Sequence, residues 1–359
     1  MSVAIAWFRV LWPLVLGAAL TAALTPFAIF AGRKLGAVDE PGERRVNKRP
    51  TPRLGGLAIY GGFMLALLFS PGFSEQRPGF ILAGSLAYAL GLLDDLRNLK
   101  PGVKLAGQIL IAAVLPIYGV SIRNVSNPFG DMIGLGWLAI PVTVFWVVAL
   151  MNMVNLIDGL DGLAAGVVIV AASSLLFLPQ CAERPFMVLL CLITIGCAAG
   201  FLPYNFHPAR TFMGDGGAYF LGLALGYITV AGALKGRAAL TLSVPFLALA
   251  VPFFDTAIAV LRRWQRRQPI FRADREHLHH RLLILGYNQR QTVIVLYLWS
   301  ALFGAGSNFL ARLAGPWGGM ILLALLACAA VGLIRLERAV PAAATYDAES
   351  LDKKAAKSS

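Results

Sequence analysis

The sequence is poor in charged residues and in cysteine. Only 14% of its 359 residues are charged, against about 25% in a typical soluble domain. In contrast, 58% are hydrophobic and the mean hydropathy is +0.72. These values exclude an ordinary soluble globular protein and indicate an integral membrane protein. The four cysteines show no disulfide or zinc-ligand spacing, so we assign no role to Cys181, Cys191, Cys197 and Cys328.

Acidic residues are scarce relative to basic ones. There are 18 Asp and Glu residues but 31 Lys and Arg residues, which gives a formal net charge of +13. Such an excess can indicate nucleic-acid binding, but here the basic residues lie in short connections between apolar runs rather than on a soluble face. We therefore expect no nucleic-acid partner, and instead contact with anionic membrane lipids and an anionic substrate.

Apolar runs that can cross a bilayer recur along the chain, since a spanning helix needs about 20 residues. No soluble domain fits between them, and no internal repeat is visible. The sequence predicts an all-α integral membrane protein, a polytopic bundle of about 11 transmembrane helices in one domain at 1–338. A disordered cytoplasmic tail is expected at 339–359. The expected spans are 11–32, 54–70, 78–93, 104–120, 137–156, 163–179, 185–202, 217–234, 239–261, 292–311 and 317–335.

The Lys and Arg residues predict the orientation, because short cytoplasmic loops carry an excess of them. Most of these residues fall in every second connection between the expected spans. Arg33 and Lys34 follow the first apolar run rather than precede it, which argues against a cleaved signal peptide. We expect the N-terminus outside and the C-terminus in the cytoplasm. All the polar motifs described next then lie at the cytoplasmic face.

Two adjacent carboxylates, Asp94 and Asp95, end the third apolar run. Like charges in a partly desolvated place repel each other unless a cation or basic group neutralises them. Mg²⁺, a hard ion that takes oxygen ligands, or the nearby Lys104 would do so. The alternative is the solvated start of a loop, which the apolar Leu92-Leu93 beside the pair disfavours.

The stretch from Asn155 to Gly162 places an amide and two carboxylates between apolar runs. A buried Asp at the bilayer centre costs roughly 2.5 to 3.5 kcal/mol, so such residues need partners. Asn155 and Asp158 share one helix face, and an amide with a carboxylate suits a nucleobase or sugar edge. Asp161 could hold a ligand or a metal. The alternative is polar contact between helices.

Two further motifs carry candidate residues. Asp215 lies between glycines at the start of the eighth run, where a helix N-terminus suits a phosphate and its Mg²⁺. Helix capping by Asp215 is the structural alternative. His277, His279 and His280 lie in the longest basic loop, and without soft ligands nearby they fit phosphate better than a transition metal.

As an ordered set, these motifs resemble the polyprenyl-phosphate N-acetylhexosamine-1-phosphate transferases, glycosyltransferase family 4. Leu278 interrupts the histidine motif, which usually has three consecutive histidines in the branch that transfers phospho-N-acetylmuramoyl-pentapeptide. The chain looks more like the N-acetylglucosamine branch that starts O-antigen, enterobacterial common antigen or teichoic acid chains. The resemblance rests on Pro52-Arg53-Leu54-Gly55-Gly56, Asp94-Asp95, Asn155-x-x-Asp158-Gly-x-Asp161-Gly, Phe212-Met-Gly-Asp215 and His277-x-His279-His280.

The resemblance implies transfer of N-acetylhexosamine 1-phosphate from a UDP-sugar to undecaprenyl phosphate at the cytoplasmic face of a bacterial inner membrane, with release of UMP. It implies Mg²⁺, which Mn²⁺ can replace, held by Asp215 and Asp95. It allows a homodimer, and it leaves direct transfer and a covalent intermediate both open. The catalytic residues it implies are Asp94, Asp95, Asp215, His277 and Lys104. The substrate-binding residues it implies are Lys48, Asn155, Asp158, Gly159, Leu160, Asp161, Asn205, Phe212, His279, His280 and Arg281.

Three other functions are alternatives to this one. The phospho-N-acetylmuramoyl-pentapeptide transferase branch is the nearest alternative. CDP-alcohol phosphotransferases need an Arg shortly after Asp-Gly, whereas Leu163, Ala164, Ala165 and Gly166 follow Asp161-Gly162 here. Ion-coupled secondary transporters place their sites at mid-membrane between related halves, whereas these acids are predicted at one surface.

Overall fold

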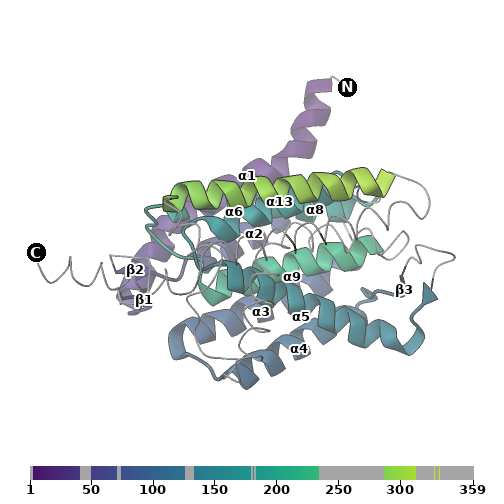
Figure 1. Cartoon of the computed structure of the whole chain (residues 1–359), viewed down its shortest axis with the longest axis horizontal. Helices are drawn as coiled ribbons and strands as arrows, with labels where there is room; N and C mark the ends of the chain where they lie inside the picture. The colour runs from purple at the N-terminus through teal and green to yellow at the C-terminus, as the bar shows by residue number, and fades with distance from the viewer. Residues whose placement is uncertain are drawn as a thin grey trace, which may run out of the picture.

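The computed structural model describes residues 3–40, 50–70, 74–125, 133–178, 181, 183–233, 287–312, 327 and 331. Long helices dominate this part of the chain (Figure 1). The helices are α1 (Val3–Lys34), α2 (Gly56–Phe69), α3 (Arg77–Arg97), α4 (Pro101–Ile117), the 3₁₀ turn η1 (Gly136–Leu138), α5 (Ala139–Ile157), α6 (Leu163–Leu176), α8 (Pro185–Asn205), α9 (Gly214–Ala233) and α13 (Gln289–Arg312).

Five stretches of helix are long and apolar enough to cross a membrane: Leu11–Lys34, Arg77–Arg97, Gly136–Ile157, Pro185–Asn205 and Gln289–Phe309. Three shorter apolar helices are Gly56–Phe69, Pro101–Ile117 and Leu163–Leu176. The helical membrane architecture agrees with the sequence. The number of eleven spans is not confirmed. The expected span at 239–261, the expected tail at 339–359, and the span at 317–335 apart from residues 327 and 331 lie outside the described residues.

The all-α prediction overlooked two short hairpins. β1 (Val38–Asp39) pairs antiparallel with β2 (Thr51–Pro52), and β3 (Asn124–Val125) pairs with β4 (Ile133–Gly134). The first hairpin joins the start of the chain to the site, because Phe212 N donates to Pro52 O at 2.8 Å and Gly55 N donates to Phe212 O at 2.9 Å. Strands of two residues have no alternating pattern to detect in a sequence.

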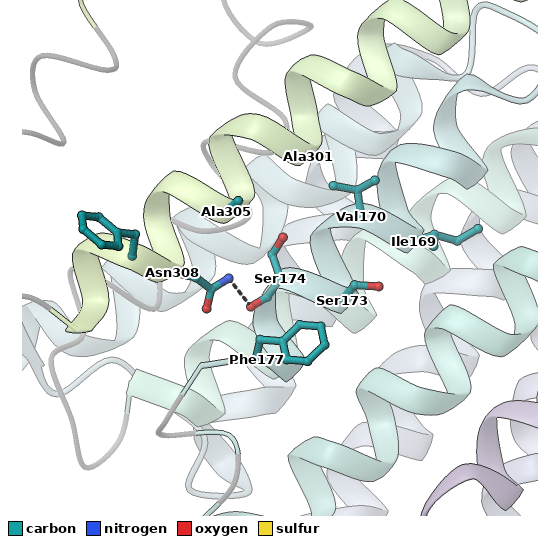
Figure 2. Close-up of a pocket in the computed structure, with 9 residues that line it drawn as sticks. Ile169, Val170, Ser173, Ser174, Phe177, Ala301, Ala305 and Asn308 are labelled. Carbon is teal, nitrogen blue, oxygen red and sulfur yellow. Dashed lines mark hydrogen bonds between the residues drawn. The ribbon is translucent and has the colours of Figure 1, made fainter.

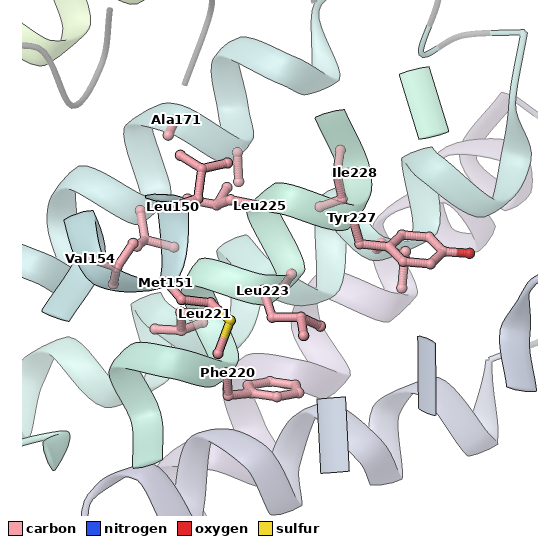
Figure 3. Close-up of a cluster of buried hydrophobic side chains, with 14 of the residues drawn as sticks. Leu150, Met151, Val154, Ala171, Phe220, Leu221, Leu223, Leu225, Tyr227 and Ile228 are labelled. Carbon is pink, nitrogen blue, oxygen red and sulfur yellow. The ribbon is translucent and has the colours of Figure 1, made fainter. Parts of the chain in front are cut away.

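Helix α9 lies at the centre of the bundle and contacts α2, α3, α5, α6 and α8 (Figure 1). Beyond Asp215 its residues are mostly apolar on all sides, as expected for a helix that is covered by its neighbours. Phe220, Leu221 and Tyr227 are buried, and Figure 3 shows them among Met151 and Val154 of α5. A rigid α9 fixes the position of whatever its N-terminus carries.

The turn between α3 and α4 brings polar groups back toward α9. Asn98 ends α3 in the left-handed conformation with φ of 49°, and its N–H donates to Asp94 O at 2.8 Å. Pro101 then begins α4, where its missing N–H costs nothing. This short reversal places Lys104, in the first turn of α4, beside the last turn of α3.

Candidate active site

The N-terminus of α9 is held by a side chain from α3. Asp95 Oδ1 accepts the N–H of Asp215 and Oδ2 accepts the N–H of Gly216, both at 3.0 Å. Arg53 donates to the backbone carbonyl of Asp95. Gly214 has φ of +68°, and a Cβ there would collide with the Arg53 carbonyl and the Asp95 carboxylate. The cap of α9 is therefore Asp95, and Asp215 is free to serve another role.

Asp215 is held from both sides. Asn155 Nδ2, at the end of α5, donates to Asp215 Oδ1 at 2.6 Å, and Lys104 Nζ lies 3.3 Å from Asp215 Oδ2. The same ammonium forms an ion pair with Asp94 Oδ2, while Asp94 Oδ1 accepts the N–H of Leu99 at 2.8 Å. Two carboxylates from distant parts of the chain thus share one cation at one end of the bundle.

Asp158 follows the last residue of α5 and lies near these acids. Burial raises the pKa of its carboxyl well above the usual value, and the negative charges of Asp215, Asp95 and Asp161 raise it further. The neighbouring Gly159 is exposed, whereas Leu160 is buried. Asp158 therefore belongs to the same acidic cluster, in a place where its ionised form is costly.

Asp161 and Asn205 stabilise the loop that leads into α9. Asp161 Oδ2 lies 2.8 Å from His207 Nδ1 and accepts the N–H of Ala209 at 3.0 Å. Asn205 Oδ1 accepts the N–H of Gly162 at 3.1 Å, and its Nδ2 donates to Thr211 O at 3.0 Å. Both side chains are buried. They bind backbone and a histidine of this protein, and the half-buried Phe212 follows in the same loop.

The structure brings together the motifs at Asp94-Asp95, Asn155 to Asp161 and Asn205 to Asp215. Lys48, His277, His279, His280 and Arg281 lie outside the described residues. Arg53 and His207 lie in motifs that the sequence shows, at Pro52 to Gly56 and beside Asn205, but their contacts with the Asp95 carbonyl and with Asp161 were not predicted. Sequence reasoning missed Tyr297, whose hydroxyl donates to Gly162 O and which carried no signal.

The carboxylates of the cluster are the donors that a metal ion would use. Within the described ranges, no three His, Cys, Asp or Glu side chains are grouped so that they alone could hold a metal ion. Mg²⁺ usually takes only one or two protein carboxylates and completes its shell with substrate phosphates and waters. Asp94 and Asp215, two hard oxygen donors that already converge on an ammonium, fit that requirement. Asp95 offers oxygens that already accept two backbone N–H groups.

A separate cavity of about 500 Å³ opens between α6 and α13 (Figure 2). Its wall is mainly apolar and includes Phe177 and Phe309. Within it, Asn308 donates to Ser174 O at 2.8 Å. On the α6 side the lining residues run from Ile169 to Phe177, about two to four turns from Gly162, and the others lie on α13. This cavity is therefore not part of the carboxylate cluster.

Comparison with known proteins agrees with the geometry. Residues 78–233 match the model of a family described as glycosyl transferase family 4. A probable undecaprenyl-phosphate N-acetylglucosaminyl 1-phosphate transferase of Bacillus subtilis is 37% identical, over 84% of this chain and 85% of the relative. A decaprenyl-phosphate N-acetylglucosaminephosphotransferase of Mycolicibacterium smegmatis is 36% identical, over 77% and 76%. A phospho-N-acetylmuramoyl-pentapeptide-transferase of Desulforudis audaxviator is 33% identical, over 72% and 83%.

Proposed function

The chain belongs to glycosyl transferase family 4, the polyprenyl-phosphate N-acetylhexosamine-1-phosphate transferases, and from this premise we propose that it transfers N-acetylglucosamine 1-phosphate. The donor is UDP-N-acetylglucosamine, the acceptor is undecaprenyl phosphate, and the products are the lipid diphosphate sugar and UMP. The relatives at 37% and 36% identity are named for N-acetylglucosamine transfer, and the pentapeptide transferase is at 33%. The product initiates a cell-envelope polysaccharide.

The observation that carries this proposal is the Lys104 ammonium shared by Asp94 and Asp215. Phosphoryl transfer requires little covalent work from the protein, so positioning and charge neutralisation dominate. Lys104 supplies positive charge at the point where two phosphate-bearing substrates must approach each other. Asn155 holds the Asp215 carboxylate in one orientation. The arrangement suits a reaction between two anions beside acidic ligands.

We place the cofactor Mg²⁺ at Asp215 with Asp94 beside it, and retain Asp95 as a further candidate ligand. When bound there, Mg²⁺, or Mn²⁺ in its place, would neutralise charge on the pyrophosphate oxygens. Asp95 itself acts first by fixing the N-terminus of α9, so that Asp215 keeps its position.

In the proposed step, an oxygen of the lipid phosphate attacks the β-phosphorus of the UDP-sugar. The new bond joins this oxygen to the β-phosphorus. The bond between the β-phosphorus and the oxygen that bridges it to the α-phosphate breaks, and UMP leaves with the electron pair of that bond. We favour direct attack over a covalent intermediate because Asp94 is paired with Lys104 and both oxygens of Asp95 accept backbone N–H groups. Neither carboxylate is an unoccupied nucleophile.

The remaining residues take their roles from their position next to Asp215 and the loop before α9. The nucleotide pocket would be formed by Asp158, Gly159, Leu160, Asp161, Asn205 and the ring of Phe212. Outside the described residues, we propose that Lys48, His277, His279, His280 and Arg281 bind phosphates. We place the site at the cytoplasmic face of the bacterial membrane, with the N-terminus outside, because most Lys and Arg residues of the sequence fall in the connections that this orientation puts inside.

The test uses purified full-length protein in detergent with undecaprenyl phosphate, Mg²⁺ and separate UDP-sugars: UDP-N-acetylglucosamine, UDP-N-acetylgalactosamine and UDP-N-acetylmuramoyl-pentapeptide. We expect UMP release and a lipid diphosphate N-acetylglucosamine identified by mass. EDTA should stop the reaction, and added Mg²⁺ should restore it. Product only from the pentapeptide donor would place the chain in the other branch, and no lipid product from any donor would refute the proposal.

A further inference from the structure

One turn deeper than the ionic cluster, α4 and α5 are joined by a pair of side-chain amides. Asn152 Nδ2 donates to Gln108 Oε1 at 2.7 Å, and Gln108 Nε2 donates to Asn152 Oδ1 at 3.5 Å. Asn152 Nδ2 also donates to Val148 O within its own helix, at 2.8 Å. Gln108 is 1% exposed, and apart from Lys104 it is the only polar side chain on α4.

The amide pair is in register with the catalytic cluster. Gln108 lies four residues after Lys104 on α4, and Asn152 lies three residues before Asn155 on α5. Residues three and four apart share a helix face. In one helical turn, Lys104 of α4 and Asn155 of α5 contact Asp215. In the adjacent turn, Gln108 of α4 and Asn152 of α5 contact each other.

This arrangement has a consequence for Asp215. Its Oδ1 is held from α5 and its Oδ2 from α4, so the orientation of the carboxylate depends on how far α4 is shifted along α5. Packing of apolar helices in lipid fixes such a shift only weakly, because lipid tails are as apolar as the side chains. A buried reciprocal amide pair is directional, and single buried polar residues are known to set helix register.

We propose that Gln108 and Asn152 are positioning residues that fix the register of α4 and α5 and thereby orient the Asp215 carboxylate for the transfer reaction. This inference rests on the proposed function. Gln108 and Asn152 touch neither Asp94 nor Asp215 by any hydrogen bond of the described residues. They act through Lys104 and Asn155.

The experiment shortens or lengthens one side chain of the pair by one methylene group and keeps both amides. Gln108→Asn and Asn152→Gln each mismatch the pair, and the double variant Q108N/N152Q keeps its total length. We expect each single variant to lose at least tenfold in kcat with little change in KM for the UDP-sugar, because a displacement of about 1 Å can cost on the order of a hundredfold. The exchanged double variant should recover most of the kcat.

A control removes an interhelical hydrogen bond of similar kind elsewhere. Trp146 Nε1 donates to Thr229 Oγ1 at 2.9 Å between α5 and α9, more than two turns from Asn155. Thr229→Val should lower Tm and leave kcat within about twofold of the unmodified enzyme, since helix contacts of this kind act on stability. If T229V reduced kcat as much as Q108N, the amide pair would have no special part in the reaction.

A second readout does not depend on turnover. Mg²⁺ should raise the Tm of the unmodified protein. This increase in Tm should be smaller in Q108N and in N152Q, and it should return to its full size in the exchanged double variant. An inactive but Mg²⁺-stabilised unmodified protein would count against the proposed function alone. An active unmodified enzyme whose kcat and Mg²⁺ response are unchanged by Q108N and N152Q would overturn the inference about the amide pair.

Discussion

The Asp95 carboxylate accepts the backbone N–H of Asp215, at 3.0 Å, across 120 positions of sequence. Its second oxygen accepts the N–H of Gly216. A side chain of α3 thereby performs the task that a capping residue of α9 would perform itself. The acid that fixes the helix and the acid that the helix presents are different residues, so their contributions to stability and to activity can be separated by substitution.

Replacing Asp95 by Ala should affect stability as well as activity. Loss of an N-terminal cap costs about 0.5 to 2 kcal/mol, and the burial of Asp95 places its effect toward the upper end. We expect a lower Tm in detergent together with a loss of UMP release. Asp215→Ala, in contrast, should abolish UMP release with a much smaller fall in Tm. An unchanged Tm in D95A would assign Asp95 to ligand binding rather than to capping.

Replacing Lys104 by Gln should leave Asp94 and Asp215 without their shared cation. We expect the rate of UMP release at saturating substrate to fall on the order of a hundredfold or more, as when one electrostatic donor is removed from an active site. Lys100→Gln is a matched control, because Lys100 is exposed and is the N-cap residue of the same helix. Comparable loss in both variants would indicate a general effect of positive charge and not a specific role of Lys104.

Replacing Asn155 by Asp should exchange a hydrogen-bond donor for a negative charge at Asp215. The two carboxylates would repel each other where Asn155 Nδ2 now donates to Asp215 Oδ1 at 2.6 Å. We expect kcat to fall at least tenfold at neutral pH, and to fall further than in Asn155→Ala, which removes the donor without adding a negative charge. Initial rates over a range of Mg²⁺ concentrations measure both effects, and full activity of N155D would contradict the proposed orientation of Asp215.

Replacing Asp158 by Asn should make the metal-free protein more stable at neutral pH. Burial and the neighbouring negative charges raise the pKa of Asp158 in the folded protein well above that of an ordinary Asp carboxyl. The folded state therefore binds this proton more tightly than the unfolded state does. This contribution to stability is complete below about pH 4 and is lost as the pH rises through the pKa of the folded state. The loss is about 1.4 kcal/mol for each pH unit between the pKa values of the unfolded and the folded state. Tm measured with EDTA from pH 5 to pH 8 should fall less in D158N. Parallel curves for the two proteins would contradict the assignment.

The convergence of the acids could be predicted from the sequence, because it depends only on which ends of the apolar runs they occupy. Asp94, Asn155 and Asp215 each stand at such an end, and the bundle brings these ends together. The helical architecture could be predicted for the same reason, since long apolar runs leave the backbone few alternatives to helix.

The partner of each acid could not be predicted. Whether Asp95 or Asp215 caps α9 depends on the distance between α3 and α9, which glycines at positions 91, 214 and 216 set by close packing. The amide pair of Gln108 and Asn152 depends on the relative shift of α4 and α5. Neither quantity is encoded in the spacing of residues within one helix, which is the only geometry that a single sequence displays.

The contact between Asp161 and His207 gives a last prediction, on substrate affinity. Asp161 holds the loop at His207 and Ala209, and this loop continues to Phe212 at the proposed nucleotide pocket. Greater mobility of this loop should weaken substrate binding more than it slows the transfer step. We expect His207→Ala and Asp161→Asn each to raise KM for UDP-N-acetylglucosamine severalfold with a smaller change in kcat.

The double variant decides how Asp161 acts. If Asp161 works through His207, the two substitutions remove the same interaction, so H207A/D161N should raise KM little more than D161N alone. If Asp161 contacts the nucleotide directly, H207A alone should be nearly silent and the effects should add. A single-turnover measurement separates binding from transfer in each variant. An unchanged KM in all three would show that the loop positions nothing in the bound substrate, because a loosened loop that still bound nucleotide normally could not be part of its pocket.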